Sequence, residues 1–442
     1  MSIEIKEQHA YKPKITSMPR YRFRELTTQS TAPATLTAAR QAMTFEISPS
    51  LCFNPGKSVI QATLSATAQA GDFTFLHAGV APFASLVWTT DLGVELARIN
   101  NLQYYSRVVP YHSTKAEDFG EVVKGQYSSI FGVTAGDGSA ALDTGTDFGV
   151  ISNAGATLNT ATHKPTPCSY LSGGADNTAV AINLRIPLAD LAKHTALGMN
   201  KDIWMPERSY VTIELAEKSQ IGFDADDYKL ANAGALVAGT VSNVSLQLAV
   251  QMDKQIADTI RQTVLGGMIQ MNVGYVVEQK TTTSAGTSHT ETLKLSGANG
   301  KRLLRVYQSY NVNTGNQLVC NVNNRTHAKV SVLEPSINGS YVYEKPINYY
   351  DVLALKGDFY RGSLFTNQQV LEDFFCWVDD FSGANRCWEL DQHAEVGIDL
   401  TQEQLQYAIS TTKTGAAYEV YTAAVVQRVL TISQAGTQIS AF

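Results

Sequence analysis

The chain has 442 residues, of which 44% are hydrophobic and 17% are charged, and its formal net charge is −6. Two domains of about 200 residues are expected, because one hydrophobic core rarely organises so long a chain. The negative charge argues against a general nucleic-acid-binding protein, which would be basic, whereas the low charged fraction is typical of a surface buried against neighbouring subunits. Composition leaves an Asn- and Thr-rich extracellular β protein open as the alternative.

The first 40 residues are predicted to be an N-terminal arm. Residues 1–26 contain six basic and three acidic residues, and the stretch YKPKITSMPRYRFRE interleaves basic and aromatic side chains. A segment of this kind has no apolar periodicity and cannot bury a core of its own, so a partner would have to order it. A disordered, solvated tail is the alternative interpretation.

The region 41–251 is predicted to be a β domain. Apolar residues alternate with polar ones over 60–68, 180–186, 211–215 and 244–250, which indicates half-buried strands. Segments 73–77 and 104–111 also read as strands, while 82–88 fits either a short helix or a buried strand. Residues 114–178 form a long polar interval, and a loop of that length is usually a projection or a binding surface.

A short helix is predicted between two of these strands. Pro187 ends the alternation of 180–186, because proline has no backbone donor for a sheet. Leu188, Leu191 and Ala192 follow at helical spacing, and Gly198 offers a stop. His194, in this helix, is interpreted as a surface or packing residue.

Residues 252–267 are predicted to form a linker helix. Met252, Ile256, Ile260 and Val264 are four apart and would share one helix face, which ends at the Gly266–Gly267 pair. A second series of strands follows in 268–442, and its order of elements repeats that of the first half. Short strands, long loops and few helices favour two tandem antiparallel sandwiches of jelly-roll type, with short crossover helices.

Residue patterns that would support catalysis or metal binding are incomplete. The Asp143-Thr144-Gly145 triplet resembles an aspartic protease motif, but no second Asp-Thr/Ser-Gly supplies the partner carboxylate. The NPGKSV stretch ends like a phosphate loop, yet its first glycine is replaced by Leu51. The eight histidines and five cysteines show no metal-ligand spacing, and no apolar run is long enough for a membrane span. We therefore predict no catalytic residues, no cofactor and no metal site, and expect a protein that is not an enzyme.

The order of elements is similar to that of the double jelly-roll major capsid proteins of tectivirus-like icosahedral viruses. The segments that carry the resemblance are FLHAGVAPFASLVWTTD, NLRIPLADLAKHTALGMNKDIWMPERSYVTIEL, VSLQLAVQMDKQIADTI, GKRLLRVYQSY, NYYDVLALKGDFYRGSLF and EVYTAAVVQRVLTI. The resemblance covers most of 40–435. It implies two eight-stranded jelly rolls standing side by side, at 41–251 and 268–442, with the crossover helix 187–200 packed where barrels meet.

The family also implies a function. Three subunits would form a pseudo-hexagonal capsomer of an icosahedral shell, assembled in a host cell, with neighbouring capsomers, penton and minor capsid proteins and an internal lipid membrane as partners. The 114–178 interval would be an exterior tower, and no sequence-specific nucleic-acid binding is expected. The basic arm would face the interior through Lys12, Lys14, Arg20, Arg22 and Arg24.

Three contacts stay open for that arm: an anionic lipid leaflet, to which each basic residue would contribute ~1 kcal/mol, the phosphates of a packaged genome, and a neighbouring subunit. The chief alternative function is a β-sandwich adhesin or carbohydrate-binding protein. Such a protein would carry a secretion signal, and the charged opening MSIEIKEQ lacks the apolar core of one.

Overall fold

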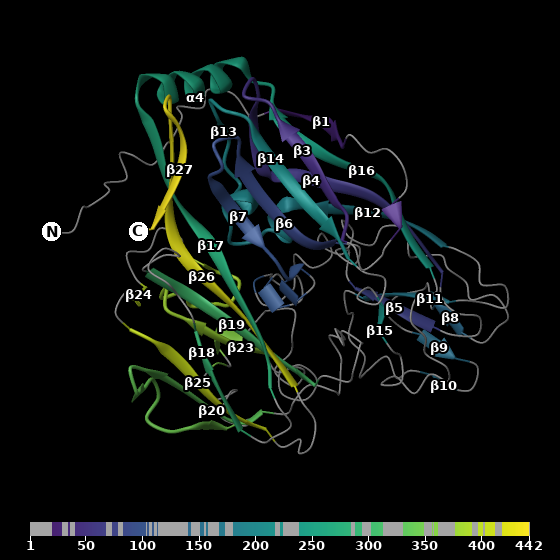
Figure 1. Cartoon of the computed structure of the whole chain (residues 1–442), viewed down its shortest axis with the longest axis vertical. Helices are drawn as coiled ribbons and strands as arrows, with labels where there is room; N and C mark the ends of the chain where they lie inside the picture. Colours follow the sequence, from purple (N-terminus) through teal and green to yellow (C-terminus); the bar gives the residue numbers. More distant parts are fainter. Residues whose placement is uncertain are drawn as a thin grey trace.

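The computed structural model is built almost entirely from antiparallel strands (Figure 1). No helix in the part of the chain that it describes is long and apolar enough to cross a membrane. The described residues are 20–28, 34–35, 40–67, 73–77, 83–102, 104–105, 108–109, 113, 140–142, 151–153, 156–157, 168–172, 180–216, 222–223, 238–283, 288–293, 302–312, 330–348, 356, 358–360, 376–390, 397–400, 403–411 and 418–441.

The first half of the chain forms a sandwich of two four-stranded sheets, extended by the short strands β2 (Ala34–Thr35) and β13 (Ile203–Trp204). One sheet has the order β1 (Tyr21–Thr27), β16 (Ala238–Gln251), β4 (Cys52–Thr67), β12 (Val180–Pro187). The facing sheet has the order β3 (Ala42–Ile47), β14 (Ser209–Leu215), β6 (Phe83–Thr90), β7 (Glu95–Ile99). Counted along the chain, the eight main strands are arranged 1-8-3-6 and 2-7-4-5, which is jelly-roll topology.

The second half repeats this arrangement. One sheet runs β17 (Met268–Thr282), β26 (Tyr418–Ser433), β19 (Arg302–Val312), β23 (Cys376–Asp380), with β24 (Ile398–Asp399) and β27 (Gly436–Ala441) at its margins. The other runs β18 (Ser288–Thr292), β25 (Leu405–Thr411), β20 (Val330–Ile337), with β21 (Ser340–Tyr341) and β22 (Ile347–Asn348) both paired to β20. The predicted fold class, two tandem jelly rolls, is therefore confirmed.

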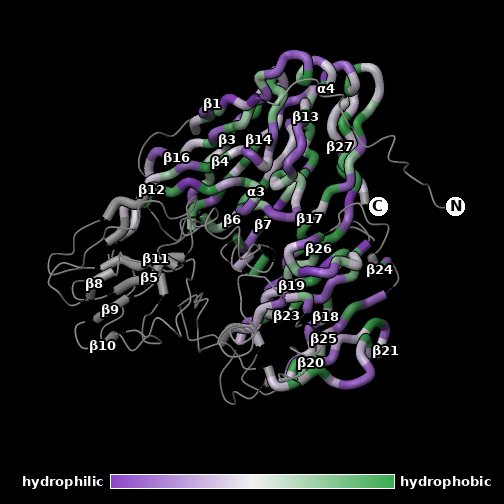
Figure 2. The backbone as a smooth tube through the Cα atoms, turned by 180° about the vertical axis from the view of Figure 1, so that it is seen from behind, coloured by the Kyte–Doolittle hydropathy of each residue, from purple (hydrophilic) through white to green (hydrophobic). Residues whose placement is uncertain are grey.

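The strands form where the residue pattern alternates. In β3 and β14 every second residue is buried, and these side chains fill the space between the two sheets of the first sandwich. Figure 2 shows the resulting mixture of hydrophobic and hydrophilic residues along the strands. Fully buried aromatic residues anchor each core, with Trp88 in the first sandwich and Trp377 in the second.

Helix α4 (Lys254–Gly266) joins the two sandwiches at one extreme of the molecule (Figure 1). Ile256, Ile260 and Val264 are buried, as their spacing predicts, but Met252 precedes the helix and is 53% exposed. The helix starts later than predicted because the Asp253 side chain caps it, accepting from Gln255 N at 3.0 Å and Ile256 N at 3.2 Å.

Six short strands form two small sheets beside the first sandwich, away from α4 (Figure 1). Four of them, β8 (Ala140–Leu142), β9 (Ile151–Asn153), β10 (Ala156–Thr157) and β11 (Cys168–Ser172), come from the predicted projection 114–178. The other two are β5 (Phe73–His77) and β15 (Gly222–Phe223), which both pair with their neighbours in the β11–β5–β15 sheet. Most of the 114–178 interval lies outside the described residues.

Two local predictions require correction, and one open alternative is resolved. Residues 104–111 were predicted as a strand, but Tyr104–Tyr105 and Val108–Val109 are helical. These four buried residues are spaced three to four positions apart, which is the period of one helix face and not that of a strand. Residues 21–27, predicted as part of the arm, form strand β1 instead, because β16 offers an edge that pairs with all seven of them. The ambiguous stretch 82–88 becomes the buried strand β6.

Candidate functional site

A conventional active site is not evident in the described residues, which contain no group of three or more His, Cys, Asp or Glu side chains able to hold a metal ion. Asp143, Lys12 and Lys14 lie outside the described ranges. The most elaborate arrangement of buried polar groups is instead the junction between the two sandwiches. This junction is the candidate functional site, because it sets how the two jelly rolls stand relative to each other.

The crossover segment predicted at 187–200 forms one side of this junction. It contains the short helix α3 (Leu188–Leu191) and the 3-10 turn η4 (Ala196–Gly198), both with buried apolar side chains. Between them the backbone of His194 is left-handed, with φ of 61°. This conformation turns the His194 side chain toward the second sandwich, where Nε2 lies 3.0 Å from the Tyr307 hydroxyl of β19. His194 is thus a buried packing residue.

Gly274 of β17 receives the backbone of the same segment. A Cβ at position 274 would lie 2.1 Å from the His194 carbonyl oxygen. Only glycine therefore permits β17 and the crossover segment to approach each other this closely. On the opposite side, the Tyr105 hydroxyl donates to the Lys193 carbonyl, and Lys193 Nζ donates to the Ser113 carbonyl. The crossover is therefore held from both sandwiches.

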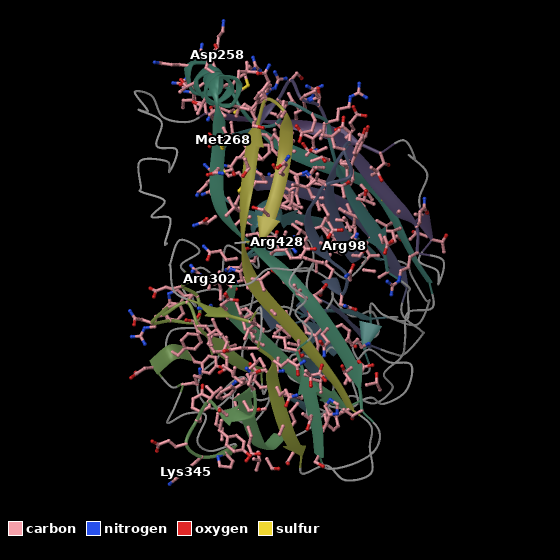
Figure 3. The ribbon with its side chains drawn as sticks, turned by 60° about the vertical axis from the view of Figure 1, so that its left-hand side comes forward. Arg98, Asp258, Met268, Arg302, Lys345 and Arg428 are labelled. Carbon is pink, nitrogen blue, oxygen red and sulfur yellow. The ribbon has the colours of Figure 1, made fainter. Side chains whose placement is uncertain are left out.

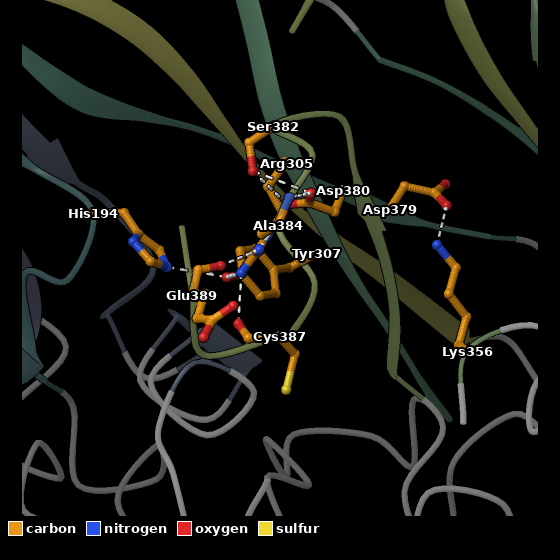
Figure 4. A network of polar contacts seen from close by, with 10 residues as sticks. All are labelled: His194, Arg305, Tyr307, Lys356, Asp379, Asp380, Ser382, Ala384, Cys387 and Glu389. Atoms are coloured by element: carbon orange, nitrogen blue, oxygen red, sulfur yellow. Dashed lines mark hydrogen bonds and ion pairs between the residues drawn. The ribbon is translucent and has the colours of Figure 1, made fainter. Parts of the chain in front are cut away.

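Arg305 of β19 organises the second-sandwich side of the junction (Figure 4). Its guanidinium is fully buried and donates to Asp380 Oδ1 at 2.6 Å, to the Cys387 carbonyl at 2.6 Å, to the Tyr307 hydroxyl at 3.2 Å and to the Glu389 carbonyl. Burial opposes the charge of Arg305, but Tyr307 and Asp380 raise its pKa. A buried arginine with all of these acceptors is a satisfied cation that holds the neighbouring loop and Tyr307 in place.

A second set of contacts lies along β7 and the turn that follows it. Glu278 of β17 accepts from the backbone N–H groups of Asn100 and Asn101 and from the Tyr421 hydroxyl at 2.7 Å. Burial raises the pKa of Glu278, although these three donors act in the opposite direction. Tyr104 stacks on Tyr421, with ring centroids 5.3 Å apart. The contacts of Glu278 with Asn100 and Asn101 and the stacking of Tyr104 on Tyr421 join the first sandwich to the second, while the Tyr421 hydroxyl holds Glu278 from within the second.

Charged residues extend the junction toward α4. Tyr275 of β17 donates to Glu95 Oε1 at 2.5 Å, and the Arg428 guanidinium lies 3.6 Å from the centre of the Tyr275 ring. Arg98, which Figure 3 labels together with Arg428, pairs with the same Glu95 at 2.6 Å. Mixed polar and aromatic contacts of this kind specify one relative orientation of two surfaces, because each donor needs its own acceptor.

Three of the basic residues that were predicted to face the interior are described by the structure, and they lie at the α4 end of the molecule. Arg20, Arg22 and Arg24 are exposed, and the Arg20 carbonyl accepts from Met252 N at 2.7 Å. Arg22 and Arg24 belong to β1, opposite Val250 and Leu248, so the predicted free arm is corrected to a strand at these two positions. The basic side chains share this end with the exposed Met252, Leu265 and Met268, of which Figure 3 labels Met268.

The Asp202 carboxylate binds side chains from three different strands at this end. Its carboxylate accepts from Tyr21 Oη at 2.8 Å, from Asn54 Nδ2 at 3.0 Å and from Gln251 Nε2 at 2.8 Å. These residues come from β1, β4 and β16. Asp202 therefore links the start of β1, where the N-terminal segment enters the fold, to the end of β16, which leads into α4. Burial and Asp202 together raise the pKa of Tyr21, which keeps its hydroxyl protonated as the donor.

Sequence reasoning missed most of the junction. Arg305 and Tyr307 were identified only as part of a strand, and Glu278 and Gly274 were not singled out. The available signal was a charged residue two positions from a tyrosine in an otherwise apolar run, RLLRVY, which predicts a buried charge in need of partners. The partners themselves, on β23 and in residues 387–389, lie more than 70 residues away.

Comparisons with known proteins bear on the fold. No family model matches the sequence, and no curated protein matches it. Among solved structures, a chain of the Sputnik virophage superposes with a TM-score of 0.57 at 11% identity, covering 98% of this chain and 90% of that one. The mavirus major capsid protein gives 0.55 at 12% identity, with 100% and 95% covered, and a chain of the PBCV-1 virus capsid gives 0.54 at 9% identity, with 98% and 100% covered. At such identities the similarity shows the fold, a double jelly roll along the full chain.

Proposed function

We propose that this protein is a structural major capsid protein of an icosahedral virus, that it acts in the virion shell and that it is not an enzyme. One observation carries the proposal: both halves of the chain have the same eight-strand order, and the match to the mavirus major capsid protein spans nearly the whole of both chains. This tandem arrangement needs no catalytic group. It supplies two similar building units on one polypeptide.

We infer further that three copies form a pseudo-hexagonal capsomer. Three chains with two similar sandwiches each would place six comparable units around one axis, which lets the capsomer meet six neighbours in a shell. A capsomer of this shape requires that the two sandwiches of each chain keep one relative orientation. The contacts of His194 with Tyr307 and of Glu278 with Asn101 cross between the sandwiches and support such a fixed orientation.

The N-terminal segment is proposed to face the interior of the particle. Lys12, Lys14 and Arg20 would contact an anionic lipid leaflet there, and Arg22 and Arg24 would contribute from the exposed side chains of β1. This placement is supported by the exposed apolar residues Met252, Leu265 and Met268 near the same end, since apolar and basic side chains together favour an anionic interface. The 114–178 projection, whose described strands β8, β9, β10 and β11 lie away from α4, would face outward as the tower.

The experiment that tests the proposal is a measurement of the assembly state. The purified chain is expected to be a stable trimer by sedimentation and to show a hexagonal outline in negative stain. Deletion of residues 2–19 should leave the trimer intact and reduce shell closure or binding to anionic vesicles. A monomer that binds glycans would instead support the adhesin alternative. If the deletion changes neither shell assembly nor vesicle binding of the trimer, the role given to the arm is contradicted.

A further inference from the structure

The hydrogen bond between His194 and Tyr307 joins the crossover segment to the second sandwich, and its direction can be assigned. The Arg305 guanidinium has donors only, so the Tyr307 oxygen accepts from it at 3.2 Å. The Tyr307 hydroxyl proton then points to His194 Nε2, 3.0 Å away. Nε2 is therefore an acceptor, and His194 is neutral, with its proton on Nδ1.

We propose that His194 is an acid-sensitive lock between the two sandwiches: when it takes up a proton, the crossover segment 188–198 is released from β17 and β19. Protonation would turn Nε2 into a donor. Both neighbours of the Tyr307 oxygen would then donate to it, and the buried hydroxyl proton would lose its acceptor. This inference concerns the fold itself and stands whether or not the protein builds a shell.

The charges around His194 also disfavour its protonation in the docked state. Burial, the Arg305 guanidinium and the Lys193 ammonium together hold the pKa of His194 well below its usual value of 6.5. The carboxylates on the neighbouring strands are committed elsewhere: Asp380 of β23 binds Arg305, and Glu278 of β17 binds Asn100, Asn101 and Tyr421. Tyr105 donates to the Lys193 carbonyl, and Asp190 of α3 interacts with the Lys193 ammonium. A protonated His194 would thus face two cations.

The fit of the crossover segment leaves no room for a compensating shift. His194 already has a left-handed backbone, and its carbonyl lies against Gly274 so closely that a Cβ there would be 2.1 Å from the oxygen. Sliding the segment along β17 would press it into this strand. Release of the segment is the remaining way to hydrate the charged ring.

The pH range follows from linkage. A histidine with a lowered pKa in the docked state binds its proton only after release, so docking is most stable above pH 6.5 and weakens as the pH falls below it. The ratio of released to docked molecules should rise by up to about tenfold per pH unit well below pH 6.5, which amounts to up to about thirtyfold between about pH 7.5 and about pH 5.

Hydrogen exchange on the full-length chain tests this proposal, with rates corrected for the intrinsic effect of pH. At about pH 5, compared with about pH 7.5, we expect protection to fall selectively in peptides covering 188–199 and 268–276, by the factor given above. His194→Gln keeps an acceptor within reach of Tyr307 but does not titrate, so it should abolish this acid response. His289→Gln is the matched control, because His289 binds Glu291 at 2.9 Å within the second sandwich and should leave the response unchanged.

Two results would overturn the lock. One is equal corrected exchange of 188–199 at the two pH values, and the other is an undiminished acid response in His194→Gln. If that variant fails to fold, the wild-type protein still decides: loss of protection confined to the junction supports the proposal, whereas equal loss in the β4 and β16 strands refutes it.

Discussion

Replacing Gly274 with alanine should destabilise the protein far more than the same change at Gly266, where the added carbon would have open space around it. The new Cβ would lie 2.1 Å from the His194 oxygen and 3.2 Å from Val425 Cγ1. Strand β17 cannot withdraw, because it is paired with β26 from Met268 to Thr282. The crossover segment must therefore move by about an ångström, the shortfall from an ordinary contact.

The cost of this movement has two parts. Overpacking of a buried contact typically costs about 1–3 kcal/mol, and loss of the His194–Tyr307 hydrogen bond adds about 1 kcal/mol. We expect Gly274→Ala to lower the free energy of unfolding by about 2–4 kcal/mol in total. Gly266→Ala, at the end of α4 with no heavy atom near the added carbon, should change it by no more than about 1 kcal/mol, and in the stabilising direction.

Urea unfolding followed by tryptophan fluorescence measures both variants. Trp88 and Trp377 are buried in different sandwiches, so single-tryptophan versions report whether the two halves unfold together. Gly274→Ala should shift the midpoint down and separate the two signals. If its midpoint matches that of Gly266→Ala at an unchanged slope, the close approach of β17 to the crossover segment is not a structural requirement, and the reasoning about the junction fails.

Three further substitutions, with one control, test other parts of the fold. Asp380→Asn should cost about 3–5 kcal/mol in urea unfolding, because it leaves the fully buried Arg305 without its ion-pair partner; stability close to wild type would contradict that role. Asp253→Ala should cost about 1 kcal/mol through loss of the α4 cap, and an unaltered melting temperature would show that the cap is dispensable. Ile260→Ala should cost about 2–5 kcal/mol as a core cavity, whereas the control Arg24→Ala, at an exposed position of β1, should stay within about 0.5 kcal/mol of wild type.

Much of the fold could be predicted because the local spacing of apolar residues indicates which face of a strand or helix is buried. The alternation at 211–215 and 244–250 indicated strands, the spacing of Ile256, Ile260 and Val264 indicated a helix, and Pro187 marked the place where the chain leaves the sheet. The repeated order of these elements was enough to infer two tandem sandwiches. Local hydrophobic periodicity is a property of consecutive residues and needs no knowledge of the partner surface.

The remaining features depend on contacts between residues that are distant in the sequence. Residues 21–27 read as an arm because their own pattern buries nothing, and they become a strand only because β16 offers an unpaired edge. The sequence around His194 predicts a surface or packing residue, and only the fold brings Tyr307, 113 positions later, within hydrogen-bonding distance of it. The sequence by itself therefore determined the strands, the linker helix and the tandem plan. Only the tertiary structure decided how the two jelly rolls are joined, because a hydrogen bond, an ion pair or a close approach to glycine needs two partners whose distance the local pattern does not contain.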